Sequence, residues 1–491
     1  MSRVIALAGF PPEILAYAIA MYSRSALSIE ESIKKVTEEK AGKFFETFYF
    51  AYGHKSIADN AHVAMALENI SQIAAFEIED QSLWDGQERS TRYQKFDTKS
   101  DCFVIPKSFR GTYLEGQYVD FATFLLGEYA FFSQACFEYL VKINTKPAEM
   151  NDAQYERTMR ARAFDVARYW LFGGIKTSVG QVTSARSLED QITRLLTSEY
   201  PDIVELAEQM KSVCISGVPL TPQGFAGGDS DRPSILPTLI KYATANPFQA
   251  EMRKAARFWA EHLGLNASVR GDLGSHLENS WVDLASSHSL EAEIIATFLY
   301  EGGHVSYREA LDKVLHLSEN ERGKILKHAF KVRGKHDPLP RAYASGYQLI
   351  YDIVMDRGGE RDLHRHRRCI QIHQQPTAVY GYNIPRIVHE AGLTSRYITG
   401  MARVPRIVAE FRDEVGVEAN YLLPFAYRSR TLYKMDLAEV AYITELRSGV
   451  AGHFSYREAA CKMYDLLVNR YPVFEGKFRV TPFETENLLK R

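Results

Sequence analysis

The densest group of chemically active side chains lies in the segment LHRHRRCIQIHQQP, residues 363–376. Arginine presents a planar fork of donors that suits phosphate or the carbonyl–amide edge of a ring. On an extended segment, Arg365 and Arg367 would point to one side and His366 to the other. We therefore expect one side of this run to hold a phosphate or a planar cofactor ring, while the other side anchors the loop.

Other interpretations of the basic run stay open on this segment alone. A short basic run is often a solvated face or a non-specific nucleic-acid patch. The chain, however, has 59 basic and 61 acidic side chains, and this balance disfavours a general binder of nucleic acid or of membrane surfaces. Metal binding is also disfavoured, because the charge of the neighbouring arginines opposes a cation beside His364 or His366. We predict no metal and no nucleic-acid partner.

A second group lies in the segment GQERSTRYQKF, residues 86–96. Alternate residues of an extended loop point the same way, so Ser90 and Arg92 could hold one phosphate between a hydroxyl and a guanidinium. Glu88 adds an acceptor that could orient a neighbour. A Ser-x-Arg-Tyr sequence is weak evidence by itself, because it occurs by chance in many proteins.

The segment around His54 and Ser56 follows a glycine. Its simplest interpretation is a helix end followed by a new helix that Ser56 caps. Four arginines also stand in helical surroundings: Arg168, Arg186, Arg430 and Arg447. Within an apolar helix, arginine needs an anionic partner. That partner is an acidic residue on the next helix or the phosphate of a ligand.

The chain that must position these groups has 491 residues, of which 46% are hydrophobic and 12% aromatic, enough for substantial cores. Residues 218–237 gather Pro, Gly, Ser and Asp without hydrophobic periodicity, which is typical of a linker or long loop. We therefore predict two domains, residues 1–217 and 238–491.

Helical periodicity is frequent on both sides of this break, and strand patterns are fewer. Helices are predicted over residues 28–53, 128–143 and 434–449. Strands are predicted over residues 4–10 and 102–107, whereas residues 63–78 fit a strand or a helix. The sequence therefore predicts an α+β protein with helix in excess.

The two halves also echo each other in order. Residues 167–196 are answered by residues 420–447, although few positions are identical. We interpret the echo as a diverged tandem duplication.

The order of these features resembles the flavin-dependent thymidylate synthases in a tandem form. That order is a GH-x-S turn, an apolar segment, a basic loop and an arginine-bearing helical region. The family signature is R-H-R followed by N/Q-E-x-S-x-R-Y on one loop. The resemblance covers roughly residues 1–200 and again 300–480. It implies two helix-rich domains, each with a central antiparallel sheet.

The departures from the family pattern are complementary. The first half keeps the second part of the signature, with Asp80, Gln81 and Ser82 in place of the basic triplet. The second half keeps Arg365–His366–Arg367 but lacks the S-x-R-Y part. In the later region, Asn420 of the second half replaces the arginine that Arg168 supplies in the first.

The resemblance implies reductive methylation of dUMP to dTMP, with methylenetetrahydrofolate as the carbon donor and NADPH as the reductant of FAD. It implies no covalent protein nucleophile. The implied catalytic residues are Arg168 and Glu88. The implied substrate-binding residues are Gln87, Glu88, Ser90, Arg92, Tyr93 and Arg168. The implied FAD-binding residues are Arg365, His366, Arg367, His54, Ser56, Ser184, Arg186 and Arg447.

Members of this family are homotetramers with sites shared between subunits, so the resemblance implies a homodimer that mimics a tetramer. Because each half has lost what the other retains, our hypothesis is one composite site per chain. Five scattered cysteines suit a reducing cytoplasm, and no apolar run is long enough to span a membrane. Two alternatives stay open. One is a related flavoenzyme acting on another pyrimidine nucleotide, and the other is a pseudoenzyme that binds flavin or nucleotide without turnover.

Overall fold

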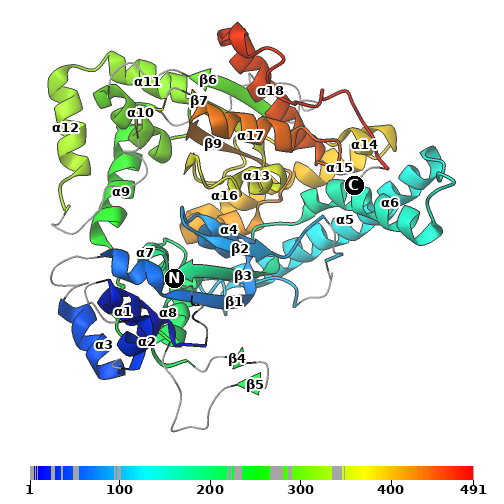
Figure 1. The fold of residues 1–491 in the computed structure, drawn as a ribbon. Helices are drawn as coiled ribbons and strands as arrows, with labels where there is room; N and C mark the ends of the chain where they lie inside the picture. Colours follow the sequence, from blue (N-terminus) through cyan, green and yellow to red (C-terminus); the bar gives the residue numbers. More distant parts are fainter. Residues whose placement is uncertain are drawn as a thin grey trace. The chain divides into compact units, whose positions relative to one another are not determined.

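The computed structural model of the protein describes residues 5, 7, 9–23, 28–34, 37–47, 55–92, 95–96, 101–217, 220–221, 224–225, 235–265, 280–285, 290–333, 345–347 and 349–489. Its elements are drawn in Figure 1. The chain forms two compact units that interleave along the sequence. The first contains residues 1–68, 77–88 and 178–247, and the second contains residues 69–76, 89–177 and 248–491. The domain boundary at residues 218–237 stays a prediction; most of that segment lies outside the described residues.

The first unit consists mainly of helices beside one sheet. Its helices are α1 (Pro12–Tyr22), α2 (Ile29–Lys34), α3 (Glu38–Phe45), η2 (Lys55–Asn60), α7 (Ala185–Leu196) and α8 (Pro201–Ser216). Its strands are β2 (Asp85–Glu88), most of β1 (His62–Ser71) and β3 (Lys176–Ser184), and the hairpin β4 (Leu220–Thr221) with β5 (Gly224–Phe225).

The predicted helix over residues 28–53 is two short helices where the structure describes it. Thr37 lies in extended backbone and its side chain accepts from the backbone N–H of Lys40, which starts α3 afresh. The strand predicted over residues 4–10 is also wrong at its described positions, because none of them is in a strand and Gly9 has a φ of +79°.

The ambiguous segment 63–78 contains both elements. β1 ends at Ser71, and α4 (Gln72–Glu79) begins at the next residue. The Ser71 hydroxyl accepts from the backbone N–H of Ala74 at 3.0 Å and so caps the first turn of the helix.

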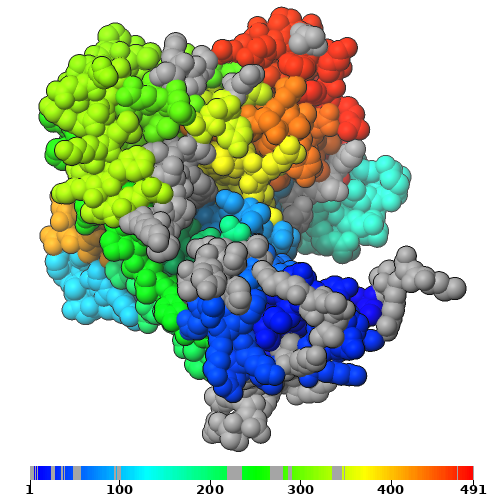
Figure 2. Space-filling view, turned by 60° about the vertical axis from the view of Figure 1, so that its left-hand side comes forward, coloured from blue at the N-terminus to red at the C-terminus, as the bar shows by residue number. Residues whose placement is uncertain are grey.

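The second unit holds the larger, four-stranded sheet. Its helices are α5 (Tyr113–Ile143), α6 (Asp152–Ala167), η3 (Arg168–Trp170), α9 (Pro247–His262), α10 (Leu290–Gly302), α11 (Tyr307–Leu315), α12 (Glu319–Ala329), α13 (Arg357–His364), α14 (Arg386–Glu390), α15 (Thr394–Met401), α16 (Val404–Val415), η5 (Gly416–Leu422), α17 (Leu437–Arg447), α18 (Phe454–Arg470) and η6 (Pro472–Phe474). Its strands are β6 (Ser280–Ala285), β7 (Leu349–Asp356), β8 (Ile370–His373) and β9 (Arg428–Met435). In Figure 2, the light-green segment that contains α11 and α12 lies at the surface of one face.

The four-stranded sheet is covered on both faces, which explains why the sequence pattern did not predict its central strands β7 and β9. Every residue of β7 and β9 is buried. Alternate β7 residues such as Tyr351 and Ile353 pack with α17 and α18 residues, whereas Ile350 packs with residues of α9–α12. Strands buried on both faces lose the period-two polar alternation.

The two larger sheets share one strand order. The first is β1-β3-β2 and the second is β6-β7-β9-β8, so β7-β9-β8 repeats the order of β1-β3-β2. In each, the first strand leads into a helix (α4 or α13) and the later long strand leads into another (α7 or α17). The pairs β2–β3, β6–β7, β7–β9 and β8–β9 are antiparallel. The chain is therefore α+β with antiparallel sheets and helix in excess, as predicted.

Within the second unit, two short segments pair in a reciprocal way. Phe172 and Pro424 face each other in an antiparallel bridge. Backbone bonds run Gly173 N–H to Leu423 O (3.2 Å), Phe425 N–H to Leu171 O (2.7 Å), Gly174 N–H to Tyr421 O (2.9 Å) and Ala426 N–H to Tyr169 O (3.1 Å). Each bond has a counterpart in which the two segments exchange roles.

Three more of the predicted helices and strands can be compared with the structure. The helix over 128–143 is part of α5, and the helix over 434–449 contains α17. The strand over 102–107 is reduced to one bridge between Phe103 and Ile175. No helix in the described part of the chain is long and apolar enough to cross a bilayer.

Candidate functional site

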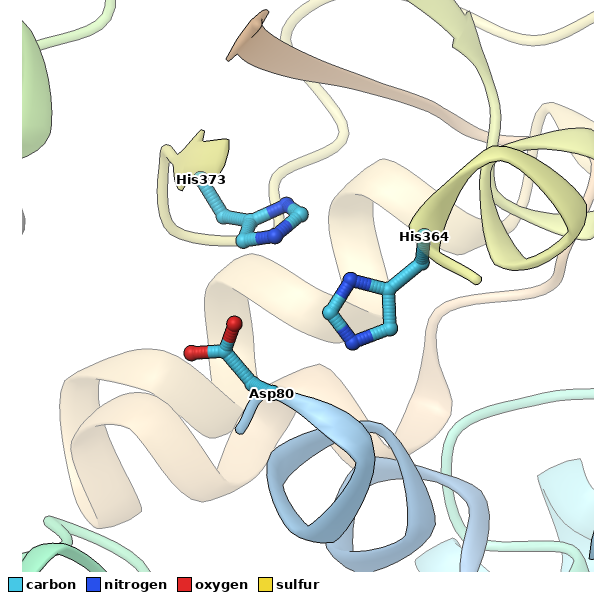
Figure 3. Close-up of side chains that lie close together, drawn as sticks. All are labelled: Asp80, His364 and His373. Carbon is cyan, nitrogen blue, oxygen red and sulfur yellow. The ribbon is translucent and has the colours of Figure 1, made fainter. Parts of the chain in front are cut away.

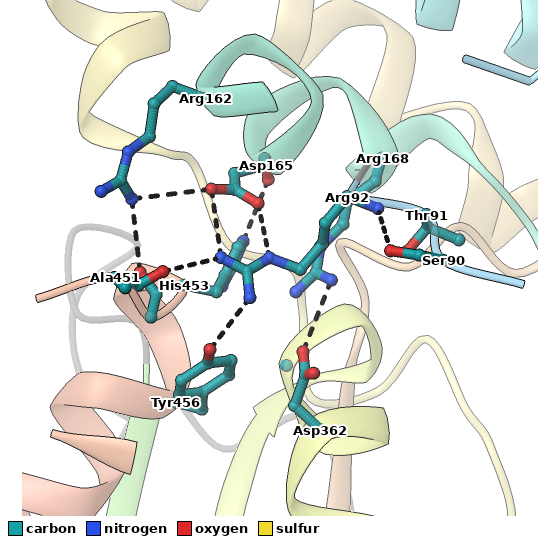
Figure 4. A network of polar contacts seen from close by, with 12 residues as sticks. Ser90, Thr91, Arg92, Arg162, Asp165, Arg168, Asp362, Ala451, His453 and Tyr456 are labelled. Carbon is teal, nitrogen blue, oxygen red and sulfur yellow. Dashed lines mark hydrogen bonds and ion pairs between the residues drawn. The ribbon is translucent and has the colours of Figure 1, made fainter. Parts of the chain in front are cut away.

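A buried network of charged side chains joins the loop of residues 89–92 to α6 and α18 (Figure 4). Arg92 is only 8% exposed. Its Nε donates to Asp165 Oδ1 at 2.8 Å, and its Nη1 donates to the Tyr456 hydroxyl at 3.0 Å. Its Nη2 donates to the carbonyl of Ala451 at 3.3 Å. Burial alone lowers the pKa of Arg92, but Asp165 and Tyr456 outweigh it, so the pKa is raised and the guanidinium stays charged.

A second arginine, Arg168, begins η3 at the end of α6 and is 2% exposed. Its Nη1 lies 3.5 Å from Asp362 Oδ2 on α13. Its Nε and Nη2 atoms are buried with no hydrogen-bond partner among the described residues. Buried donors without acceptors are costly, so these two atoms call for an acceptor that a ligand or water would supply.

A glycine makes room for Arg168. A Cβ at Gly358, in the first turn of α13, would lie 3.3 Å from Arg168 Nε and 3.5 Å from its Cζ. The preceding strand end, Asp356, accepts from the backbone N–H of Gly359 at 2.7 Å and thereby caps α13. Burial raises the pKa of Asp356, an effect that the charge of Arg168 partly offsets.

His453, the N-cap residue of α18, also belongs to this network. Its Nε2 donates to the carbonyl of Asp165 at 3.0 Å, and its Nδ1 accepts from the backbone N–H of Ser455 at 3.3 Å. Burial, with the positive charge of Arg168, lowers the pKa of His453 well below its usual value. The imidazole is therefore neutral, with its proton on Nε2.

The loop of residues 89–92 also meets α13 directly. Arg361 Nη1 donates to the Thr91 hydroxyl at 3.4 Å, and the Arg361 guanidinium lies over the Phe425 ring at 5.2 Å. Residues from the two predicted halves therefore meet within one compact unit.

The basic run is not an extended segment, as the alternation argument assumed. His364 ends α13, and Arg365 caps it with αR backbone (φ −68°). Asp356 caps the start of α13, and the helix extends through His364, the first histidine of the run. After the run, the chain turns and enters β8. Arg365 and Arg368 are exposed, and Arg367 is half-buried.

His366 points inward from this turn and is held by protein groups. Arg447 Nε donates to His366 Nε2 at 2.8 Å, and Glu439 Oε1 lies 3.4 Å from His366 Nδ1. Burial lowers the pKa of His366, although Glu439 acts in the opposite direction. Arg447 and His366 therefore support the loop, and both ring nitrogens of His366 are occupied.

A polar cluster lies behind the run (Figure 3). The rings of His364 and His373 are 5.0 Å apart, and Phe76 stacks on His364 at 4.2 Å. His373 Nδ1 lies 3.2 Å from Glu360 Oε1. Burial raises the pKa of Glu360, but His373 and Arg357 more than offset this and bring it to about 2. Asp80, also labelled in Figure 3, belongs to the first unit, and we assign no metal to these side chains.

Several of the predicted site residues lie in the first unit. Gln87 and Glu88 stand on β2, opposite Gly180 and Val179 of β3. The Ser184 hydroxyl accepts from the backbone N–H of Ser187 at 3.2 Å and caps α7. Arg186 Nη1 pairs with Asp59 at 3.1 Å. His54, Tyr93 and the side chain of Ser56 lie outside the described residues.

Arg430, expected in a helix, lies on β9. It pairs bidentately with buried Asp352 on β7, with both N–O distances at 2.9 Å. Its anionic partner is therefore a protein carboxylate on the neighbouring strand.

Sequence reasoning did not identify Asp165, Asp362, His453 and Tyr456 as parts of the network. The segment GHFSYREA contains His453 and Tyr456 and is nearly repeated as GHVSYREA at residues 303–310. That near-repeat was a usable signal for His453 and Tyr456. The two carboxylates carry no motif, and only the fold brings them to Arg92 and Arg168.

Comparison with known proteins finds a similarity to one family in the first part of the chain. Residues 3–220 match the family described as thymidylate synthase complementing protein. The match covers less than half of the chain, and over these residues the chain is similar to that family.

Curated relatives match over nearly the full length. A UPF0159 protein of Chlamydia muridarum is 22% identical over 99% of this chain and 93% of its own length. One of Chlamydia pneumoniae is 23% identical over the same shares. The UPF0159 protein Ta1429 of Thermoplasma acidophilum is 22% identical over 93% of each chain.

Among solved structures, the flavin-dependent thymidylate synthase ThyX from Helicobacter pylori, complexed with FAD and dUMP, is 14% identical. The match covers 43% of this chain and 90% of that one, with a TM-score of 0.27. A second structure of that protein with FAD and dUMP, at 15% identity, has a TM-score of 0.28.

Proposed function

We propose that the chain is a flavin-dependent thymidylate synthase-like enzyme, which converts dUMP to dTMP with methylenetetrahydrofolate and NADPH through FAD. The family match over residues 3–220 supports the reaction class. The observation that carries the proposal is the meeting of two half-motifs. The loop that contains Ser90 and Arg92 lies against α13, whose C-terminal end leads into Arg365–His366–Arg367.

The groups around the end of α13 fit the anionic part of FAD. Arg365 is exposed at the end of α13, with Arg367 half-exposed two residues later. Guanidinium forks suit phosphate oxygens and the carbonyl edge of a ring. His366 cannot offer a free ring nitrogen, because Arg447 and Glu439 occupy both. In the proposal, His366 positions the loop and the two arginines bind the cofactor.

Bound FAD would supply hydride transfer between NADPH and the pyrimidine. The protein's own task is to orient the nucleotide and to stabilise negative charge on its ring oxygens. Arg168 suits this task, because two buried donors of its guanidinium have no partner among the described residues. From the resemblance alone, we also propose Gln87, Glu88, Ser90 and Tyr93 as nucleotide-binding residues, and Ser184 and Arg186 as FAD-binding residues.

The proposal includes a tandem duplication. The repeated strand order and the reciprocal pairing of Leu171–Gly174 with Leu423–Ala426 support it. A reciprocal contact between equivalent segments is the mark of a two-fold interface in homodimers. A duplicated chain would carry that interface internally.

The test uses the full-length protein. Purified protein is titrated with FAD by fluorescence and then assayed for dTMP with dUMP, methylenetetrahydrofolate and NADPH. An Arg365→Gln/Arg367→Gln double variant should weaken FAD binding at least about tenfold. The matched control is Arg160→Gln/Arg406→Gln, which removes two exposed arginines paired with glutamates on their own helices. Failure to bind FAD, or equal losses in both double variants, would refute the cofactor assignment.

A second candidate is a protein that binds flavin or nucleotide without turnover. One observation favours it: Asp165 and Tyr456 already occupy donors of Arg92 that a nucleotide phosphate would need. FAD binding with no dTMP formed would support this candidate. Turnover of UMP or dCMP in place of dUMP would instead identify a related flavoenzyme.

A further inference from the structure

The reciprocal pairing in the second unit assigns a counterpart to each residue around Arg168. Equivalent bonds run from Gln72 N–H to Ile175 O and from Arg357 N–H to Tyr427 O, both at 3.1 Å. The next pair runs from Ile73 N–H to Gly173 O and from Gly358 N–H to Phe425 O, both at 3.2 Å. The bonds from Leu171 N–H to Arg168 O and from Leu423 N–H to Asn420 O match in the same way, at 3.0 and 3.1 Å.

These matches make Gly358 the counterpart of Ile73, and Arg168 the counterpart of Asn420. The same correspondence extends outward, since Tyr118 donates to Val104 O at 2.8 Å and Tyr397 donates to Asn383 O at 2.9 Å. All of these residues belong to the second unit. The unit therefore contains two equivalent positions with different side chains.

The first position is built to receive an acceptor. Arg168 is buried, Gly358 leaves space beside its guanidinium, and its Nε and Nη2 have no partner among the described residues. Asp362 contacts only one edge of the guanidinium, with Nη1 at 3.5 Å. The open donors are therefore those that face away from Asp362.

The second position is filled. Asn420 is shorter than arginine and uncharged, and its Oδ1 accepts from Arg412 Nη2 at 2.6 Å. The larger Ile73 takes the place of Gly358. A Cβ on Gly173 would lie 2.8 Å from the Asn420 carbonyl oxygen and 2.9 Å from Ile73 Cδ1, which places both groups in one tightly packed spot.

We propose that the chain holds one nucleotide site, at Arg168, and one closed counterpart, at Asn420, and that the Gly358/Ile73 difference decides which position is open. This rests on the proposed function for the identity of the ligand, dUMP. It goes beyond that function by assigning the open position to Arg168 rather than to its counterpart, and by naming Gly358 as a residue that determines where the nucleotide binds.

The experiment measures the number of dUMP molecules bound per chain. Equilibrium dialysis with radiolabelled dUMP is carried out on the full-length protein saturated with FAD. One dUMP per chain is expected. Two per chain would overturn the inference while leaving the proposed function intact, and no binding would overturn both. One dUMP per chain without dTMP formation would overturn only the catalytic proposal.

Two variants localise the site. Arg168→Gln should weaken dUMP binding roughly 10- to 100-fold, as expected for a lost charged hydrogen bond. Arg412→Gln makes the same chemical change beside Asn420 and should leave both affinity and stoichiometry unchanged. Thermal unfolding of both variants checks that they fold. A folded Arg168→Gln protein with normal affinity would refute the assignment, as would an Arg412→Gln protein that loses binding.

Gly358→Ala gives an independent readout. Its Cβ would lie 3.1 Å from Asp356 Oδ1 and 3.3 Å from Arg168 Nε, both tighter than ordinary contact, so the carboxylate and the guanidinium must each give by a few tenths of an ångström. We expect weaker dUMP binding by at least about tenfold with FAD affinity unchanged. An unaltered dUMP affinity in the folded variant would show that Gly358 does not determine the site.

Discussion

Arg92 offers a direct test of whether its contacts are structural or serve a ligand. The side chains of Arg92 and Asp165 are 10% and 4% exposed, and their Nε–Oδ1 distance is 2.8 Å. Removing one member of a buried ion pair usually costs about 3–5 kcal/mol, because the other charge is left buried. Arg162 Nη1 lies 3.8 Å from Asp165 Oδ2 and would partly compensate the carboxylate. We therefore expect Arg92→Gln to lower the free energy of unfolding by about 3 kcal/mol, near the low end of that range.

The assay is urea unfolding of four proteins that form a double-mutant cycle. They are the natural protein, Arg92→Gln, Asp165→Asn and the double variant. We expect the double variant to be less destabilised than the sum of the single variants, with a coupling energy of about 2 kcal/mol. dUMP binding to the Arg92→Gln protein is measured in parallel. A destabilisation below about 1 kcal/mol together with a large loss of dUMP affinity would refute the structural interpretation and favour a phosphate contact.

Three further predictions concern pH and helix capping. The pKa of Glu360 is about 2 in the folded state and 4.5 ordinarily, so its contribution to stability is present above pH 4.5 and is lost as pH falls toward 2. Glu360→Gln should therefore cost on the order of 3 kcal/mol at pH 7 and almost nothing at pH 2, measured by urea unfolding; an equal cost at both values would contradict it. His453 has a lowered pKa, so the unfolded chain takes up its proton first as pH falls through 6.5 and stability declines below that value. His453→Gln should flatten this decline in unfolding curves between pH 7 and 5, and an unchanged slope would count against a buried neutral imidazole. Ser184→Ala should cost about 1 kcal/mol through the lost cap of α7, and a loss of FAD affinity without destabilisation would instead support a cofactor role.

The basic run shows how far sequence reasoning reached. Its unusual composition drew attention to this segment, and the order of motifs around it resembles a family to which residues 3–220 are similar. The conformation was wrong, because alternation was treated as evidence of an extended chain. The helix-capping residue Asp356 and the two glycines after it decide the local geometry, and they lie before the run.

Long-range pairs could not be read from the sequence. Asp165 and Arg92 are far apart along the chain, and neither belongs to a motif that names the other. The segment 63–78 stayed ambiguous for a local reason: Ser71 ends a strand and caps a helix at once, so both periodicities share one apolar run. The echo between residues 167–196 and 420–447, in contrast, was visible in order even where identities were few.

The reciprocal pairing near Phe172 also has a consequence for how the protein is made. The carbonyls of Tyr169 and Leu171 accept from the backbone N–H groups of Ala426 and Phe425. At ribosomal rates of roughly 5–20 residues per second, those partners emerge some 10–50 seconds later. During that interval the nascent chain exposes the unpaired carbonyls of this segment, together with aromatic side chains that are buried in the folded protein. We therefore expect synthesis of this protein to depend on chaperones, and fragments that stop before Phe425 to aggregate.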